Sequence, residues 1–316
     1  MSDMKEILDA MEELGVPSED PKGLPKSGQT FPDGGHYRME VSGVERPSTL
    51  RALIEEREKR DIPIHRLIST VMGSTYLDDE ELQDFAQMAH DEDMEVIITP
   101  GPRSSWNTGR QVATPEGALS GLRVRGSDNI VYALRDIKRC IDFGFKGFLV
   151  TDEGLLWLAD QLKEKGLIPK DVTFKVSIYA GHANAAGGKL LENLGAGTFN
   201  PLGDISIPMF ASIRQAIDIP IDIHILLGES MGGFNRFYEG PDMARVASPC
   251  YFKIEPGAAL AAGGGIYKQW TDPGFHEFLV REKVKNAEII HNIIQDKYPD
   301  LKLSEHGCEG LAIPQP

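Results

Sequence analysis

Residues 220–255 have the sequence PIDIHILLGESMGGFNRFYEGPDMARVASPCYFKIE. Two runs rich in β-branched and aromatic residues, 221–226 and 251–255, flank an amphipathic stretch at 241–247, which predicts a strand, a helix and a second strand. A helix between two strands returns the chain to the end of the sheet where it began, so the strands are predicted to be parallel. The segment therefore predicts a β–α–β unit.

The same unit repeats along the chain from residue 37 onward. The predicted strands are residues 37–42, 65–70, 95–99, 148–151, 173–179, 198–200, 221–226 and 251–255. The predicted helices are residues 48–60, 78–92, 129–143, 155–165, 186–194, 207–217, 241–247 and 275–297. Eight consecutive units in α/β order favour a closed (β/α)8 TIM barrel over an open sheet.

The predicted barrel covers residues 36–300, between two shorter segments. Residues 1–35 are predicted to form a short helix and a lead-in rich in proline and glycine, and residues 301–316 a C-terminal tail. A doubly wound sheet is the alternative fold, but the chain contains neither G-x-G-x-x-G nor G-x-x-x-x-G-K-[ST]. We therefore expect no nucleotide cofactor.

Composition limits the classes of partner. Of the 316 residues, 33 are Lys or Arg and 48 are Asp or Glu, a formal net charge of −15 that disfavours nucleic acids and anionic membranes. No apolar run is as long as a membrane span, and the N-terminus lacks the order of a secretory signal, so a cytoplasmic location is expected. The widely spaced Cys140, Cys250 and Cys308 predict reduced thiols and no iron–sulfur cluster.

Three long connections follow predicted strands, at residues 100–128, 228–240 and 256–274. In a parallel barrel such connections lie at the C-terminal face, where active sites are built. We therefore expect the functional residues at this mouth, with long loops around it.

Charged residues alternate with apolar ones in strands that should be apolar throughout. The alternation places Asp222 and His224 on one face of their strand, Lys253 and Glu255 on one face of the next, and Glu40 on an inner face of the first. These five are the candidate catalytic residues, predicted to meet inside the barrel because the strands are adjacent. They would serve as general acids and bases or, less favourably for Lys253, as an imine-forming amine. The alternative is a structural ion-pair network.

Metal-assisted chemistry is a second option for the same region. Oxygen and imidazole ligands for a divalent ion such as Zn²⁺ or Mn²⁺ are offered by Asp152, Glu153, His182, His224 and Glu255. No compact H-x-x-x-H or H-x-H spacing supports this option.

Several polar and aromatic residues are candidates for binding a substrate. Arginine forks match carboxylates and phosphates, so arginines near the mouth of an acidic protein predict a small anionic substrate. The candidate binding residues are Arg103, Trp106, Arg123, Arg125, Tyr179, Asn200 and Arg236.

Residues 228–232, GESMG, match the G-x-S-x-G pattern of a serine-hydrolase elbow. That elbow requires a helix directly after the serine, and the following GFNR predicts none. A chance match is the favoured interpretation.

Five segments resemble a group of uncharacterised bacterial TIM-barrel proteins that are related to the collagenase-like peptidases (family letter U, number thirty-two). They are residues 106–109 (WNTG), 122–126 (LRVRG), 151–157 (TDEGLLW), 181–184 (GHAN) and 232–239 (GGFNRFYE). The resemblance covers residues 36–300 and implies a barrel-type fold, without identifying catalytic residues. Members with an iron–sulfur cluster carry cysteines that this chain lacks.

These observations predict a barrel enzyme that acts on a small polar, anionic metabolite by acid–base or metal-assisted chemistry, as a lyase, hydrolase or isomerase. The enzyme alternative is a collagenase-like peptidase. The non-enzyme alternative is a ligand-binding or assembly protein. A homo-oligomer is compatible with either.

Overall fold

The computed structural model describes residues 2–69, 74–101, 123–228, 233–255 and 274–316. Eight parallel strands form its centre: β1 Tyr37–Ser42, β2 Arg66–Ser69, β3 Glu95–Ile98, β4 Gly147–Val150, β5 Thr173–Val176, β6 Thr198–Phe199, β7 Ile221–Leu227 and β9 Cys250–Glu255. They pair in chain order, and β9 pairs with β1, so the sheet closes on itself. The predicted TIM barrel is confirmed.

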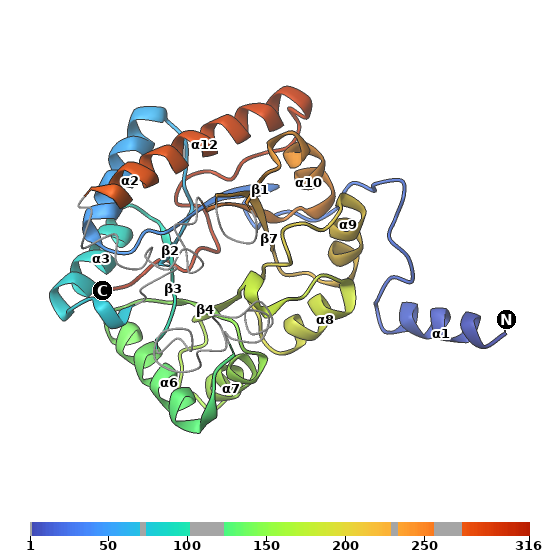
Figure 1. The fold of residues 1–316 in the computed structure, drawn as a ribbon, viewed down its shortest axis with the longest axis horizontal. Helices are drawn as coiled ribbons and strands as arrows, with labels where there is room; N and C mark the ends of the chain where they lie inside the picture. Colours follow the sequence, from blue (N-terminus) through green and yellow to red (C-terminus); the bar gives the residue numbers. More distant parts are fainter. Residues whose placement is uncertain (1, 70–73, 102–122, 229–232, 256–273) are drawn as a thin grey trace.

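A helix follows each barrel strand and packs on its outer side (Figure 1). The helices are α2 Pro47–Arg60, α3 Asp79–Asp91, α6 Gly126–Asp142, α7 Glu153–Glu164, α8 Ala185–Asn193, α9 Ile207–Ala216, α10 Gly240–Ala247 and α12 Phe275–Lys297. Short 3-10 turns occur at η1 Ser74–Tyr76, η3 Ile178–Ala180 and η5 Phe237–Glu239. The N-terminal helix α1, Ser2–Glu13, stands apart from the ring.

One small element was not predicted. Strand β8, Phe234–Asn235, pairs antiparallel with the end of β7 through Leu226 and Leu227. It lies directly beyond the G-x-S-x-G segment, whose residues 229–232 are outside the described part of the chain.

The two faces of the barrel strands have different compositions. Outward side chains such as Val41, Ile223 and Phe252 join one large apolar core with the helices. Inside the barrel, an apolar cluster of Ile68, Ile97 and Leu149 covers the β2–β4 side. Polar and charged side chains fill the rest of the interior, Arg66 of β2 among them, and these define the candidate site.

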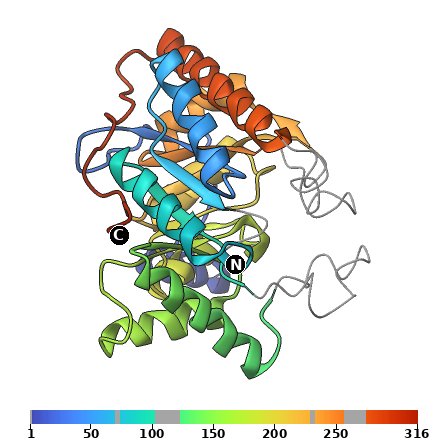
Figure 2. The same cartoon turned by 90° about the vertical axis from the view of Figure 1, so that its left-hand side faces the viewer.

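The C-terminal tail closes the N-terminal end of the barrel. Arg38 donates to the carbonyl oxygen of Glu309 (2.7 Å) and to the hydroxyl of Ser304 (3.1 Å), and Tyr37 forms a bridge with Leu303. Figure 2 shows the red C-terminal segment along this end of the barrel. Residues 301–316 thus complete the barrel because they supply partners for polar groups at its floor.

His65 links this tail to the sheet. Its Nδ1 accepts the backbone N–H of Met39 (3.0 Å), so Nε2 carries the hydrogen that reaches the carbonyl oxygen of Ser304 (2.9 Å). Burial lowers the pKa of His65 to about 3, so the folded protein keeps this imidazole neutral.

We expect acid to destabilise the protein through this histidine. An unfolded histidine has a pKa of about 6.5. Below that pH His65 is protonated in the unfolded state but stays neutral in the folded state. The stability present at neutral pH is therefore lost as the pH falls. Between pH 6.5 and 4 the loss amounts to roughly 3 kcal/mol for one such group. Urea unfolding across this range should give a weaker pH dependence for His65→Gln than for the wild type. Equal slopes would contradict the assignment.

Candidate active site

Four charged side chains form a network in the middle of the barrel: Glu40 of β1, Arg66 of β2, Lys175 of β5 and Asp222 of β7. Arg66 donates to both carboxylates, and Lys175 Nζ lies 3.2 Å from Glu40 Oε2 and 2.5 Å from Asp222 Oδ2. All four side chains have 0% exposure. We call these residues the buried charge network.

The charges of the network balance. Burial disfavours the charged form of Arg66, but Asp222 and Glu40 outweigh it and raise the pKa of Arg66. Burial, with Arg66 as a neighbouring cation, lowers the pKa of Lys175 to about 8. Arg66 also stacks on the ring of Tyr251, 3.4 Å from the ring centroid. The network therefore contains two cations and two anions, with no net charge left over.

His224 of β7 and Lys253 and Glu255 of β9 form that layer, and we call them the mouth trio. His224 Nε2 lies 3.1 Å and Lys253 Nζ 3.3 Å from the same oxygen, Glu255 Oε2. The side-chain exposures are 0% for His224, 4% for Lys253 and 10% for Glu255, so exposure rises toward Glu255 at the C-terminal end of β9.

A β-bulge follows His224. Ile225 and Leu226 together lie opposite the single residue Ile254, whereas His224 pairs directly with Lys253. Such bulges re-aim a strand and are frequent beside active sites. The irregularity occurs at the level of the mouth trio.

Asn200 determines which nitrogen of His224 carries the hydrogen. Its Nδ2 lies 2.9 Å from the carbonyl oxygen of Asp222, 3.2 Å from that of Pro201 and 3.0 Å from His224 Nδ1. Carbonyl oxygens accept hydrogen bonds, so this amide nitrogen donates and His224 Nδ1 accepts. His224 Nε2 therefore donates to Glu255, and both ring nitrogens are occupied.

The pKa values agree with a neutral histidine beside a carboxylate. Burial, and then the charge of Lys253, lower the pKa of His224 to about 4. Burial raises the pKa of Glu255, but Lys253 and then His224 outweigh burial and hold it well below its usual range. At neutral pH, Glu255 is an anion held by one cation and one neutral donor.

Lys283 of α12 adds a further cation at the edge of this layer. It is buried and donates to the carbonyl oxygen of Ser42 at the end of β1. Burial lowers the pKa of Lys283 to about 8, while Glu255 and Glu45 oppose that shift. Gly43 makes room for it, because a Cβ there would lie 2.6 Å from Lys283 Nζ.

The predicted catalytic residues are all inside the barrel, but at two depths. His224, Lys253 and Glu255 meet at one oxygen, whereas Glu40 and Asp222 lie in the buried charge network. The prediction did not include Arg66, Lys175 or Lys283. Arg66 and Lys175 occupy inward positions of their strands, which the alternation of polar and apolar residues could have revealed. Lys283 lies on helix α12, where no sequence pattern indicates that it reaches the site.

The five proposed metal ligands do not converge. His224 and Glu255 belong to the mouth trio, while His182 Nε2 contacts Glu153 Oε1 at 2.8 Å. Asp152 accepts the backbone N–H groups of Leu155 (3.0 Å) and Val124 (3.1 Å) as the N-cap of α7.

Within the described residues, no three His, Cys, Asp or Glu side chains form a group that could hold a metal ion. In both histidine–glutamate pairs the carboxylate already faces a cation of the protein. Arg123 lies beside Glu153, and Lys253 lies beside Glu255. The five donors therefore do not form one metal site within the described residues, and metal-assisted chemistry stays a prediction.

Two of the proposed binding arginines are saturated by the protein. Arg123 donates to Glu153 and to the carbonyl oxygens of Thr151 and Ala180. Arg236 donates to Glu239 and to the carbonyl oxygens of Gly203 and Ile205. Both guanidinium groups hold loops together, and their role in substrate binding stays a prediction.

The other binding candidates have different surroundings. Asn200 lies beside the mouth trio, 3.0 Å from His224. Arg125 precedes α6 and Tyr179 lies in η3, and both are half-buried. Arg103 and Trp106 lie outside the described residues.

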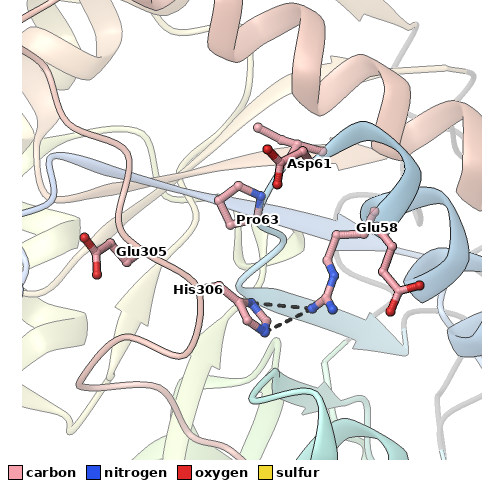
Figure 3. Close-up of a pocket in the computed structure, with 7 residues that line it drawn as sticks. Glu58, Asp61, Pro63, Glu305 and His306 are labelled. Carbon is pink, nitrogen blue, oxygen red and sulfur yellow. Dashed lines mark hydrogen bonds between the residues drawn. The ribbon is translucent and has the colours of Figure 1, made fainter.

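A separate cavity of about 520 Å³ lies between the end of α2 and the C-terminal tail (Figure 3). Its lining includes Arg57, Asp61 and His306, and Arg57 contacts His306 at 3.1 Å and Glu92 at 2.6 Å. Arg57 and Asp61 directly precede β2, and His306 belongs to the C-terminal tail, so the cavity lies at the N-terminal face, where barrel residues serve stability. We do not assign the active site to it.

Among the described helices, none combines the length and the apolar character that a membrane span requires.

Comparisons with known proteins found similarity in solved structures. No protein-family model and no curated protein sequence matches the chain. The YdjI aldolase from Escherichia coli K12 is 13% identical with a TM-score of 0.42, covering 83% of this chain and 90% of its own. A U32 peptidase is 16% identical with a TM-score of 0.38, covering 65% and 74%.

The carboxyl transferase domain of Rhizobium etli pyruvate carboxylase, solved with pyruvate and biocytin, is 14% identical with a TM-score of 0.44, covering 88% of this chain and 50% of that one. These values are too low to transfer an activity. The resemblance to the U32 peptidases therefore stays a prediction, and function is argued from the residues of the mouth trio.

Proposed function

We propose that this protein is a barrel enzyme that moves a proton at the carbon next to a carbonyl group of a small, polar, anionic metabolite. One observation carries the proposal: a lysine ammonium and a neutral histidine converge on one carboxylate oxygen, Glu255 Oε2, toward the C-terminal ends of β7 and β9. A lyase that cleaves a carbon–carbon bond and an isomerase share this enolate-forming step.

Each member of the trio has a chemical role in this reaction. Glu255 takes the proton from carbon, the C–H electron pair moves into a carbon–carbon double bond, and the carbonyl oxygen becomes an enolate oxygen. Lys253 donates a hydrogen bond to that oxygen as its negative charge develops. His224 donates to Glu255 and orients it. Returning a proton to the same carbon restores the carbonyl group and exchanges that hydrogen with solvent. In a hydroxycarbonyl compound, an isomerisation is completed when the proton returns to the former carbonyl carbon while the hydroxyl proton of the neighbouring carbon passes to the enolate oxygen.

Substrate binding would also strengthen the base. Lys253 is the main cation that lowers the pKa of Glu255 against the effect of burial. When Lys253 turns toward a substrate oxygen, burial dominates and the pKa of Glu255 rises. Lys253 and Lys283 place two ammonium groups near this carboxylate, which supports an anionic substrate.

Hydrogen–deuterium exchange tests the proposal without knowledge of the co-substrate. The protein is incubated in D2O with a panel of 2-oxo acids and hydroxyketones, and the loss of the signal of the hydrogens next to the carbonyl is followed by proton NMR. We expect at least one compound to exchange about 100-fold or more faster than without protein. If no compound exchanges its hydrogens faster with the protein, the proposed function is overturned. The alternative, a structural ion-pair network inside the barrel, would then be favoured.

A further inference from the structure

Two buried acceptor atoms inside the barrel lack a hydrogen-bond partner within the described part of the chain: Asn200 Oδ1 and Glu40 Oε1. The Asn200 side chain belongs to a residue with 1% exposure and Glu40 to one with 0%. Leaving a buried acceptor unpaired costs roughly 1–3 kcal/mol, so native proteins pair nearly all of them. Lys175 Nζ, in the same charge network as Glu40, is a buried donor that also lacks a hydrogen-bond partner within the described residues, so that layer holds a donor of its own. Asn200 Oδ1, beside the mouth trio, is the atom that points to a missing donor.

The orientation of the Asn200 amide is determined by its surroundings. Nδ2 faces two carbonyl oxygens and the accepting Nδ1 of His224, so the amide cannot be turned over without placing acceptors against acceptors. Oδ1 is consequently the atom left for a ligand. Because Asn200 contacts His224, this free acceptor lies beside the mouth trio.

We infer that the substrate carries a hydroxyl group whose hydrogen is accepted by Asn200 Oδ1, which makes Asn200 a specificity-determining residue. This inference rests on the proposed function and narrows its substrate to a hydroxycarbonyl compound. A hydroxyl fits better than an ammonium group, because the two carboxylates of the buried charge network are already matched by Arg66 and Lys175. A further positive charge there would be unpaired.

Glu40 Oε1 is the second unpaired acceptor, one layer deeper. Its other oxygen, Oε2, is taken by Arg66 and Lys175. Glu40 is fully buried and Lys175 Nζ lies beside it, so the substrate hydroxyl is assigned to Asn200 Oδ1 alone. An apolar group in place of the hydroxyl would leave Asn200 Oδ1 unpaired.

Two probes of nearly the same shape separate this selection from proton transfer. Hydroxypyruvate and 2-oxobutanoate share the carboxylate, the ketone and two exchangeable hydrogens, and differ by a hydroxyl in place of a methyl group. Exchange rates of both are measured with the full-length protein in D2O, each divided by its rate without protein. We expect hydroxypyruvate to be favoured by at least about tenfold, since a site built to bind a hydroxyl rejects the analogue that lacks it.

Asn200→Ala should reduce that ratio to about one. The variant also removes the contact to His224. A fall in the exchange rates of both probes therefore reports the positioning of His224, whereas a change in the ratio of the two rates reports the contact to the hydroxyl group. Asn292→Ala, on the exposed face of α12, is the matched control and should keep the wild-type ratio.

The outcomes separate the inference from the proposed function. Exchange of both probes with no preference, or a preference that persists in Asn200→Ala, overturns the hydroxyl contact and leaves the function standing. If neither probe exchanges, equilibrium titrations of both with the wild type and Asn200→Ala decide the inference, because binding does not require proton transfer. Equal affinities would then overturn it, as expected if a water molecule alone fills the position.

Discussion

We expect Glu255→Gln to slow the exchange reaction by about 100-fold or more, the usual contribution of one general acid or base. Glutamine keeps the shape of the side chain but cannot take a proton from carbon. Lys253→Met should have an effect of similar size, since it removes the donor for the developing enolate oxygen. Rates are measured by proton NMR in D2O, and circular dichroism checks the fold of each variant.

Lys138→Met is the matched control for Lys253→Met. Lys138 also pairs with a carboxylate, that of Asp142, but its side chain is 59% exposed on α6. We expect it to leave the rate unchanged. Wild-type rates in folded Glu255→Gln and Lys253→Met proteins would show that the mouth trio is not the site.

His224→Ala distinguishes a positioning role from a general structural one. His224 helps hold the pKa of Glu255 below its ordinary value, so its removal should raise that pKa. The base is active as an anion, so the acidic limb of the pH–rate profile should move to higher pH. A reduced rate with an unshifted profile would mean that His224 does not act through Glu255.

Arg66→Met should destabilise the protein by about 3–5 kcal/mol, because it leaves two buried carboxylates short of a cation. Arg66 donates to both Glu40 and Asp222, and all three side chains are fully buried. Urea unfolding at neutral pH measures the change. Adding Glu40→Gln and Asp222→Asn to Arg66→Met should recover part of the loss, since the uncompensated charges are then gone.

The matched control for this second prediction is Arg281→Met. Arg281 pairs with Glu55, and their side chains are 37% and 55% exposed. A pair in solvent contributes at most about 1 kcal/mol. Similar losses for Arg66→Met and Arg281→Met would contradict the view that the network supports the barrel.

The sequence by itself determined the barrel and the inward faces of its strands. Alternation with a period of two placed Asp222 with His224 and Lys253 with Glu255 on one face, and the structure has each of these side chains inside the barrel. The start of a helix is also determined by residues close together in the sequence. Asp78 and Glu81, for example, form the capping box at the start of α3. These features depend on neighbours within a few residues, so the sequence is sufficient for them.

Only the tertiary structure decided which charges meet. Asp222 and His224 are two residues apart on β7, yet one joins Arg66 and the other joins Glu255. Their positions along β7 set the difference in depth, and the stagger of the closed sheet sets which side chains of the other strands lie at each depth. That stagger depends on the pairing of all eight strands rather than on any one of them. The proposed metal ligands separated for the same reason, because Glu153 and His182 end different strands from His224 and Glu255.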